Sequence, residues 1–250
     1  MKQKILLFLL PLAITTNCFS QGNEKNSKDC VRKGFTSINM GVSIPTGNFK
    51  SDNFNNNEAG FATNGAVFDI AYGYEIAPDF GVTVVYRGQA NGKNLGTYAQ
   101  SLANYFGSGS VSVESSAFTL GGVMAGIYGS HPITNKLSIQ ARTLAGFSVA
   151  VLPAMTTIAY DDSKTKLVTW FQDRAETTTF SYIIGAGATL DISKKTYLLF
   201  NLDFYSANAE WDDVRIISIG HITKTTEIDQ YNFKQKFSTV NMSIGLGFRI

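Results

Sequence analysis

The chain has 250 residues, of which only 16% are charged, whereas glycine (23), phenylalanine (18) and tyrosine (11) are frequent. This charged fraction is low for a soluble domain, in which about a quarter of the residues are usually charged. A formal net charge of +2, without any long run of Lys or Arg, gives no support for binding to nucleic acid. The two cysteines, Cys18 and Cys30, do not form the paired motifs of zinc sites.

The first twenty residues predict a secretory signal peptide. A short basic start precedes an apolar run over residues 5–14, and a small and polar stretch then leads to a cleavage site between Ser20 and Gln21. The apolar run is too short for a transmembrane helix, which needs about 20 apolar residues. The alternative is a lipoprotein in which Cys18 carries the lipid, but the residues before Cys18 match that pattern poorly.

Eight later segments alternate between apolar and polar residues with a period of two, which is typical of β-strands with two unlike faces. They are residues 35–44, 64–75, 80–90, 116–129, 137–151, 180–192, 196–204 and 238–250. The alternation is clearest in the last segment, where Val240, Met242 and Ile244 alternate with Asn241 and Ser243. The glycine-rich segment 116–129 fits either register.

The connections between these segments alternate strictly between short and long. Tight turns rich in turn-forming residues are expected at 77–79, 131–135 and 193–195, and long polar segments at 45–63, 91–115, 154–177 and 207–236. Strands of about 9 to 11 residues are long enough to cross a bilayer when tilted. The pattern predicts an all-β fold, an eight-stranded antiparallel up-and-down transmembrane β-barrel with its long loops outside the cell.

Charged side chains on the polar faces of the strands indicate which face points inward. An eight-stranded barrel has an interior that side chains can fill. We therefore expect an interior polar network of Asp69, Arg87, Arg142, Asp191, Asp203 and Arg249. Because a hairpin about Pro78 places Asp69 opposite Arg87, we predict that these two form a cross-strand ion pair.

Aromatic residues near strand ends favour an apolar face that contacts lipid; they are Tyr72, Tyr74, Phe80, Tyr128, Tyr197 and Tyr205. One alternative is a soluble lipocalin-like barrel with its apolar face inside. A second alternative is a helical membrane protein, but the candidate stretches 116–135 and 143–160 are interrupted by Pro, Gly, Ser and Thr.

The last residues carry a more specific signal. Gly245, Phe248 and Ile250 resemble the C-terminal assembly signature of outer-membrane barrels, although the usual terminal residue is Phe. With the signal peptide and the eight segments, the chain resembles the small outer-membrane β-barrel families related to OmpA and OmpX. The resemblance implies outer-membrane lipid and the barrel assembly machinery as partners. We accordingly expect residues 1–20 to be a signal peptide, 21–34 a flexible periplasmic leader and 35–250 the barrel.

Catalytic and metal-binding patterns are weak. His131 lies at a predicted periplasmic turn, and His221 lies near Ser218 in the last outer segment without an acidic third member. The acidic groups at 161–162 and 210–213 match no metal-binding loop. We interpret Trp211 as an anchor at the membrane–water boundary, and leave open whether Trp170 and Phe171 contact a partner or anchor a loop.

The expected function is a non-enzymatic one in the outer membrane of a Gram-negative cell, without a metal or cofactor. The barrel would stabilise the envelope or present its four long loops to an unidentified external partner. The alternatives are a narrow pore for small solutes and a barrel enzyme that modifies lipid A. Eight strands argue against an open channel, since open porins have about 16.

Overall fold

The structure, a computed structural model, describes residues 34–56 and 58–250, which all belong to one compact unit. Its strands are β1 (Gly34–Pro45), β2 (Ala62–Ala77), β3 (Phe80–Lys93), β4 (Ser110–Ser115), β5 (Phe118–Pro132), β6 (Leu137–Leu152), β7 (Met155–Tyr160), β8 (Lys166–Gln172), β9 (Ala175–Asp191), β10 (Thr196–Gly220) and β11 (Thr225–Arg249). Two helices, α1 (Gly47–Lys50) and α2 (Leu95–Phe106), lie between them. The predicted signal peptide and nearly all of the leader, with Cys18 and Cys30, lie outside the described residues.

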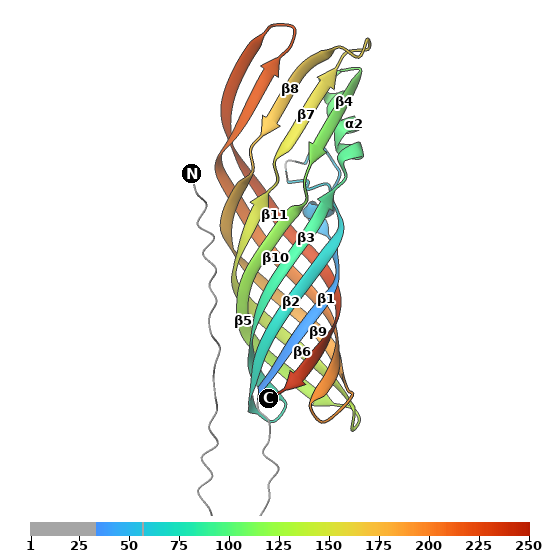
Figure 1. Cartoon of the computed structure of the whole chain (residues 1–250), viewed down its shortest axis with the longest axis vertical. Helices are drawn as coiled ribbons and strands as arrows, with labels where there is room; N and C mark the ends of the chain where they lie inside the picture. Colours follow the sequence, from blue (N-terminus) through green and yellow to red (C-terminus); the bar gives the residue numbers. More distant parts are fainter. Residues whose placement is uncertain (1–33, 57) are drawn as a thin grey trace, which may run out of the picture. The chain divides into compact units, whose positions relative to one another are not determined.

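Eight strands close into a ring in the order β1-β2-β3-β5-β6-β9-β10-β11, and β11 pairs with β1 to complete it. Every pairing is antiparallel, and all eight ring strands overlap the predicted segments (Figure 1). The predicted fold class, an eight-stranded antiparallel up-and-down barrel, is confirmed. No helix in the described part of the chain is long and apolar enough to cross a bilayer.

The three short turns lie where the sequence places them, and local side chains stabilise two of them. Thr134 Oγ1 accepts hydrogen bonds from the backbone N–H groups of Lys136 and Leu137. Ser193 Oγ accepts from the N–H groups of Lys195 and Thr196 in the same way. Such bonds let short polar side chains replace backbone partners at a turn. In outer-membrane barrels the short turns face the periplasm, so the opposite end is the outer end.

The outward face of the ring is apolar and the inward face is largely polar. Along β10, Phe200, Leu202 and Phe204 are exposed, whereas Asn201 and Asp203 between them are buried. The same alternation leaves apolar side chains exposed on the other ring strands, among them Ile38, Met40, Ile70, Val84, Val123, Phe147, Ile184, Met242 and Ile244. Soluble proteins rarely expose a continuous apolar surface of this extent. This apolar belt contacts lipid, and the soluble lipocalin-like alternative is wrong.

Strand β5 takes one definite register. Val123 and Ile127 point outward and are exposed, while Leu120 and Met124 point into the barrel and are buried. Both faces of this segment are apolar, which explains why its alternation fits either register. Part of the lumen is therefore filled by apolar side chains, which join Val85 of β3, Leu144 of β6 and Ile183 of β9.

The long connections are far more ordered than the predicted polar loops. Strands β10 and β11 continue as a paired ribbon beyond the ring, from Ala207↔Phe237 to Gly220↔Thr225, so the expected loop 207–236 is wrong. Strand β8 pairs with the end of β10, β7 with β8, and β4 with β7. We call these three strands together with residues 214–220 and 225–231 the outer sheet; it rises above the ring in Figure 1.

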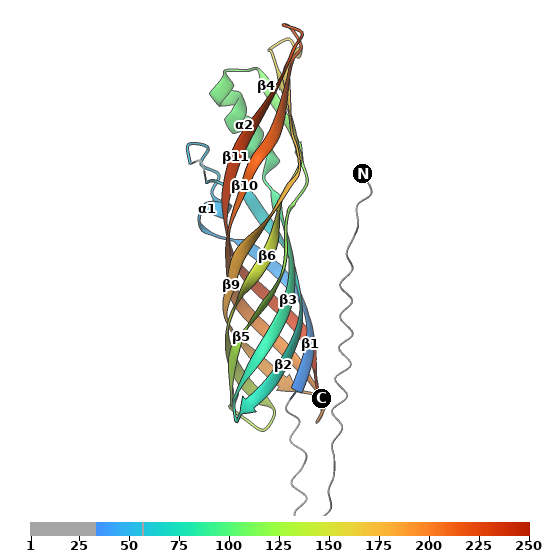
Figure 2. The same cartoon turned by 90° about the vertical axis from the view of Figure 1, so that its left-hand side faces the viewer.

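Helix α2 forms within the segment predicted as the loop 91–115. The Asn94 side chain accepts a hydrogen bond from the Thr97 backbone N–H at its start, and Gly107 ends it in the left-handed conformation (φ 62°). These are the preferred residues for the two ends of a helix. Figure 2 shows α2 beside β4, on the same side of the barrel as α1.

Candidate functional site

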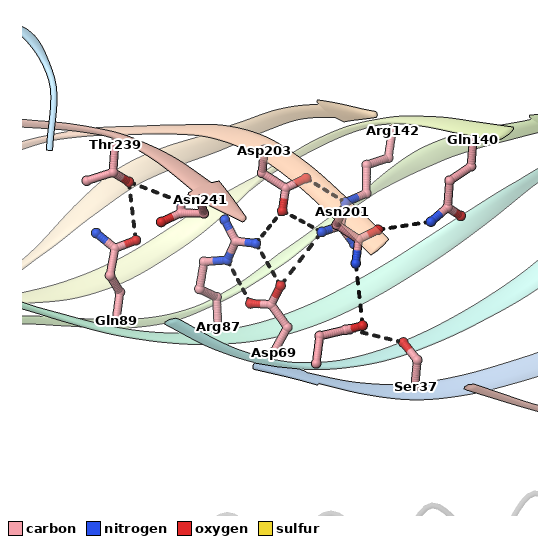
Figure 3. Close-up of polar contacts among 11 residues, drawn as sticks. Ser37, Asp69, Arg87, Gln89, Gln140, Arg142, Asn201, Asp203, Thr239 and Asn241 are labelled. Atoms are coloured by element: carbon pink, nitrogen blue, oxygen red, sulfur yellow. Dashed lines mark hydrogen bonds and ion pairs between the residues drawn. The ribbon is translucent and has the colours of Figure 1, made fainter. Parts of the chain in front are cut away.

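A cluster of four charged side chains occupies the middle of the barrel. Strand register places Asp69 of β2 directly opposite Arg87 of β3. Arg87 Nε and Nη2 donate to the two carboxylate oxygens of Asp69, each at 2.7 Å, and Nη2 also lies 2.6 Å from Asp203 Oδ2 (Figure 3). The fork-shaped guanidinium therefore bridges two carboxylates on different walls of the barrel.

Arg142 of β6 completes this cluster. Its Nε and Nη2 donate to Asp203 at 3.0 and 2.6 Å, and Nη2 lies 3.7 Å from Asp69 Oδ2. Two cations and two anions thus balance within a space from which water is largely excluded, since Arg87 and Asp203 are 2% and 1% exposed. Gly185 makes room for them, because a Cβ there would collide with Asp203 Oδ1. We call these four residues the ionic cluster.

Hydrogen-bonded polar side chains fill the lumen on both sides of the ionic cluster. Toward the periplasm, Gln140 Nε2 donates to Asn201 Oδ1 at 3.0 Å, and Asn201 Nδ2 donates to Asn39 at 3.4 Å. Toward the outer end, Asn241 donates to Thr239 (3.1 Å), Thr239 to Gln89 (3.3 Å), and Gln89 to Asn91 (2.9 Å). These layers link strands that are not neighbours in the ring, so they tie the walls together.

Aromatic residues close the outer end of the lumen. Phe49 of α1 packs with its ring centre 4.8 Å from that of Phe237 and 5.6 Å from that of Phe118. Trp211 packs on Phe237 at 6.1 Å, and its Nε1 donates to the Ala150 carbonyl at 3.2 Å. We call Phe49, Phe118, Trp211 and Phe237 the aromatic plug.

The interpretation of Trp211 as a membrane anchor is wrong, because this side chain is only 2% exposed and points into the barrel. The inward alternation of β10 runs on through Tyr205, Ala207 and Ala209 to Trp211, and only then does a bulge interrupt the pairing. Tyr205 and Tyr197 are buried in the same way, so they do not belong to a lipid-facing aromatic belt either.

The two remaining residues of the predicted network form a separate pair. Arg249 Nη2 lies 2.6 Å from Asp191 Oδ1, and the guanidinium covers the ring of Tyr197 with its central carbon 4.9 Å from the ring centre. Both charged side chains are about one-third exposed at the periplasmic end. The structure thus brings four of the six residues together and leaves Asp191 and Arg249 apart from them.

The residues of the C-terminal signature occupy different faces of β11. Phe248 and Ile250 are exposed on the outer face, whereas Gly245 faces the lumen. A Cβ at Gly245 would collide with Asn39 Oδ1 and the Ile38 carbonyl, so glycine has a packing role there.

The histidines have surroundings that differ from those of a catalytic pair. His221 Nε2 lies 2.9 Å from Thr169 Oγ1, so its recorded partner is Thr169. Ser218, the candidate nucleophile, is paired in the ribbon with Glu227. His131 is exposed near a turn. Within residues 34–56 and 58–250, no three His, Cys, Asp or Glu residues are arranged to hold a metal.

Two of the acidic residues noted in the outer segments, Asp161 and Glu210, have structural partners. Asp161 Oδ1 accepts the Thr165 backbone N–H at 2.7 Å, and Glu210 pairs with Lys234 at 2.9 Å. Asp161 therefore stabilises a turn, and Glu210 forms a surface ion pair.

A cavity of about 550 Å³ lies above the aromatic plug. Its walls come from the segment before β2, from α2, from β7 and β8, and from the ribbon, with Lys93 at the outer end of β3. Lys93 lies beyond the apolar belt, and burial lowers the pKa of its ammonium to about 8. We call this space the outer cavity. Sequence reasoning missed it, because no motif connects segments so far apart in the chain.

No protein-family model and no curated protein matches the sequence. Among solved structures, the chain is similar to a major outer membrane protein from Thermus thermophilus, with a TM-score of 0.51 and 8% identity over 87% of this chain and 99% of that one. It is also similar to Neisserial surface protein A (TM-score 0.47, 10% identity, 87% and 97% covered). A third is Ail, the attachment invasion locus protein of Yersinia pestis (0.40, 15%, 87% and 99%). At these identities the similarity concerns the fold, which is that of an outer-membrane β-barrel.

Proposed function

We propose that this chain is a non-enzymatic outer-membrane protein in which a closed barrel holds the outer sheet rigidly at the cell surface, where it contacts an external partner. The observation that carries the proposal is the pairing of β10 with β11 from the periplasmic end to the tip of the ribbon, which only one bulge interrupts. Each strand has 25 residues and spans about 80 Å, whereas a tilted crossing strand needs only about 9 to 11 residues.

The filled lumen supports an anchor in preference to a pore. The ionic cluster, the polar layers and the aromatic plug follow one another along the barrel axis. Small solutes would have to displace ion pairs between Arg87, Arg142 and Asp203 that are almost fully buried. Breaking such a buried pair leaves an uncompensated charge, which is costly.

The outer sheet supports a surface role. In the upper part of β11, residues 225–232 are exposed on both faces, Ile228 and Tyr231 among them, and Ile222 is exposed in the turn at the tip of the ribbon. The lower parts of β10 and β11 have one face buried in the lumen. Exposed apolar and aromatic side chains on a rigid sheet are suited to contact with another molecule.

Insertion by the outer-membrane assembly machinery is part of this proposal. Gly245, Phe248 and Ile250 supply the pattern from which we infer it. Replacing Phe248 and Ile250 together by serine should lower the amount of barrel in the outer membrane of growing cells.

Planar-bilayer recording tests the closed barrel. We expect no steady single-channel steps from the purified protein under conditions in which a large porin gives them. Regular steps would contradict the anchor and favour the narrow pore. For the enzymatic alternative, His221→Ala should leave the lipid A mass spectrum of the host unchanged, and a changed spectrum would contradict a non-enzymatic role.

A further inference from the structure

The outer cavity has the size of a small-molecule site, and both aromatic and polar side chains line it. Binding pockets for small molecules are usually about 300 to 1,000 Å³, mainly apolar, with a few polar groups that fix the orientation of the ligand. The outer cavity, at about 550 Å³, is lined by Phe61, Tyr98, Phe118, Trp211 and Phe233. It lies outside the apolar belt, so a ligand would reach it from the external medium.

The charge of this cavity is positive and unbalanced. Lys93 and Lys234 line it, and none of the described lining residues is acidic. Lys234 is already paired with Glu210 at 2.9 Å. Lys93 Nζ instead lies 3.9 Å from the centre of the Tyr98 ring and 3.8 Å from Met155 Sδ, and Lys93 forms no ion pair with any described residue. A half-buried cation among aromatic groups is stabilised by an anion that enters beside it.

Two of the amides that line the outer cavity already donate to backbone carbonyls, and Lys93 is the lining cation that forms no ion pair with a described residue. Gln172 Nε2 donates to the Pro153 carbonyl at 3.0 Å, and Gln235 Nε2 donates to the carbonyls of Glu58 and Lys236 at 3.2 Å. A single uncommitted cation matches a monoanion such as a carboxylate better than a doubly charged phosphate, which recruits several donors.

An apolar extension of the outer cavity offers space for the rest of the ligand. A second cavity of about 210 Å³ shares Tyr98, Phe106, Met155 and other residues with the first. It is lined in addition by Trp170, whose ring stacks on that of Phe106 at 5.2 Å and 18°. The two spaces are therefore next to each other, and the aromatic side chains of Tyr98, Phe106 and Phe233 line both of them.

We propose that the outer cavity binds a small amphiphilic carboxylate, whose carboxylate group pairs with the Lys93 ammonium and whose alkyl or aromatic body lies against the aromatic walls. No bond is made or broken in this binding. The inference goes beyond the anchoring role, because a closed barrel can hold the outer sheet with or without a ligand in this cavity.

The two tryptophans of the chain make the test direct, because Trp211 lines the outer cavity and Trp170 lines its extension. The protein, in lipid nanodiscs, is titrated with ω-bromoundecanoate, whose bromine quenches tryptophan fluorescence on contact. ω-Bromoundecanol serves as the uncharged twin of this probe. We expect saturable quenching by the carboxylate and at least about tenfold weaker binding of the alcohol, because a charge-assisted contact is lost.

Variants at Lys93 test whether this residue pairs with the carboxylate group of the ligand. Lys93→Met should weaken carboxylate binding at least about tenfold, whereas Lys93→Arg should bind it nearly as well as wild type. Lys194→Met is the matched control, because it removes one exposed lysine at the opposite end of the barrel. Altered migration without boiling confirms that each variant is folded.

Three results would overturn the proposal: no saturable quenching, equal affinities for the carboxylate and the alcohol, or equal carboxylate affinities of Lys93→Met and wild type. If Lys93→Met did not fold, the comparison of the two probes on wild type would still decide. The bilayer recording that tests the anchoring role measures conductance, whereas the quenching experiment measures ligand binding. A failure of one proposal can therefore be told from a failure of the other.

Discussion

Strand β10 passes through two regions of the molecule, the barrel and the outer sheet, that differ in how apolar and polar residues follow one another. In its lower half, Phe200 and Leu202 face lipid while Asn201 and Asp203 face the lumen, so polarity alternates residue by residue. In its upper half, within the outer sheet, Val214 is buried, Arg215 is exposed and residues 216–220 are all partly exposed, so the alternation disappears. Lipid on one side and a filled lumen on the other impose a period of two on the barrel. The outer sheet, which lies outside the lipid, shows no such period, although the pairing of β10 with β11 resumes after one bulge and continues to the tip.

Removing one member of the ionic cluster should lower the unfolding free energy of the barrel more than any other change considered below. Asp203→Ala leaves Arg87 and Arg142 buried with only Asp69 between them, and we expect a loss of about 3 to 5 kcal/mol in unfolding free energy. Asp191→Ala, which breaks the one-third-exposed pair with Arg249, should cost about 1 kcal/mol or less. Urea unfolding followed by the change in electrophoretic migration measures both. Equal losses would mean that the ionic cluster does not hold the barrel walls together.

The pH dependence of carboxylate binding should be the next largest effect. Burial lowers the pKa of Lys93 to about 8, so its ammonium is charged below this pH and loses its charge above it. A carboxylate remains anionic throughout, so its affinity should fall by about tenfold per pH unit above 8, until the pKa of the ligand-bound lysine is reached.

The other titratable groups lining the outer cavity are Tyr98, Tyr105 and Lys234. Burial raises the pKa of Tyr98, and pairing with Glu210 raises that of Lys234, so neither changes charge near pH 8. The variant Lys93→Arg should bind with little pH dependence, because arginine stays charged. An equally steep decline in this variant would assign the titration to another group.

Shortening the ribbon should have the smallest effect on the barrel. Replacing residues 212–232 by Asn-Gly joins Trp211 to Phe233, which already face each other, through a two-residue hairpin turn. Because the removed residues lie outside the lumen, we expect the unfolding free energy to change by about 1 kcal/mol or less. Urea unfolding gives this value, and a loss as large as that of Asp203→Ala would show that the two regions stabilise each other.

Much of the barrel could be predicted because lipid outside and a filled lumen inside require apolar and polar residues to alternate along each strand. The eight strands follow from alternation, and the pairing of Asp69 with Arg87 follows from a short turn at Pro78 that sets the register. Joining this pair to Arg142 and Asp203 requires the stagger of the closed ring, which no local pattern contains. The sequence therefore indicates the charged candidates and the pair Asp69–Arg87. It does not indicate that Arg142 and Asp203 join this pair while Asp191 and Arg249 form a separate one.

The outer region could not be predicted in the same way. The alternation weakens after Phe204, so the sequence predicts that Trp211 lies in a long loop after the strand, yet β10 continues with inward-facing residues to Trp211. Strands β4, β7 and β8 have only 6, 6 and 7 residues, and they are ordered through pairing with one another and with the ribbon. Lys93 enters a binding cavity only because α2 and β7 fold over it.

Two positions with nearly equal exposed fractions test the central claim most directly. Leu202 in the apolar belt is 52% exposed and Tyr231 in the outer sheet is 50% exposed. Each is replaced by cysteine in a background in which the native cysteines are serine, and is spin-labelled in lipid bilayers. The account predicts that oxygen, which concentrates in lipid, relaxes the label at 202, and that a water-soluble nickel chelate relaxes the label at 231. Equal access of the nickel chelate to both labels would contradict it.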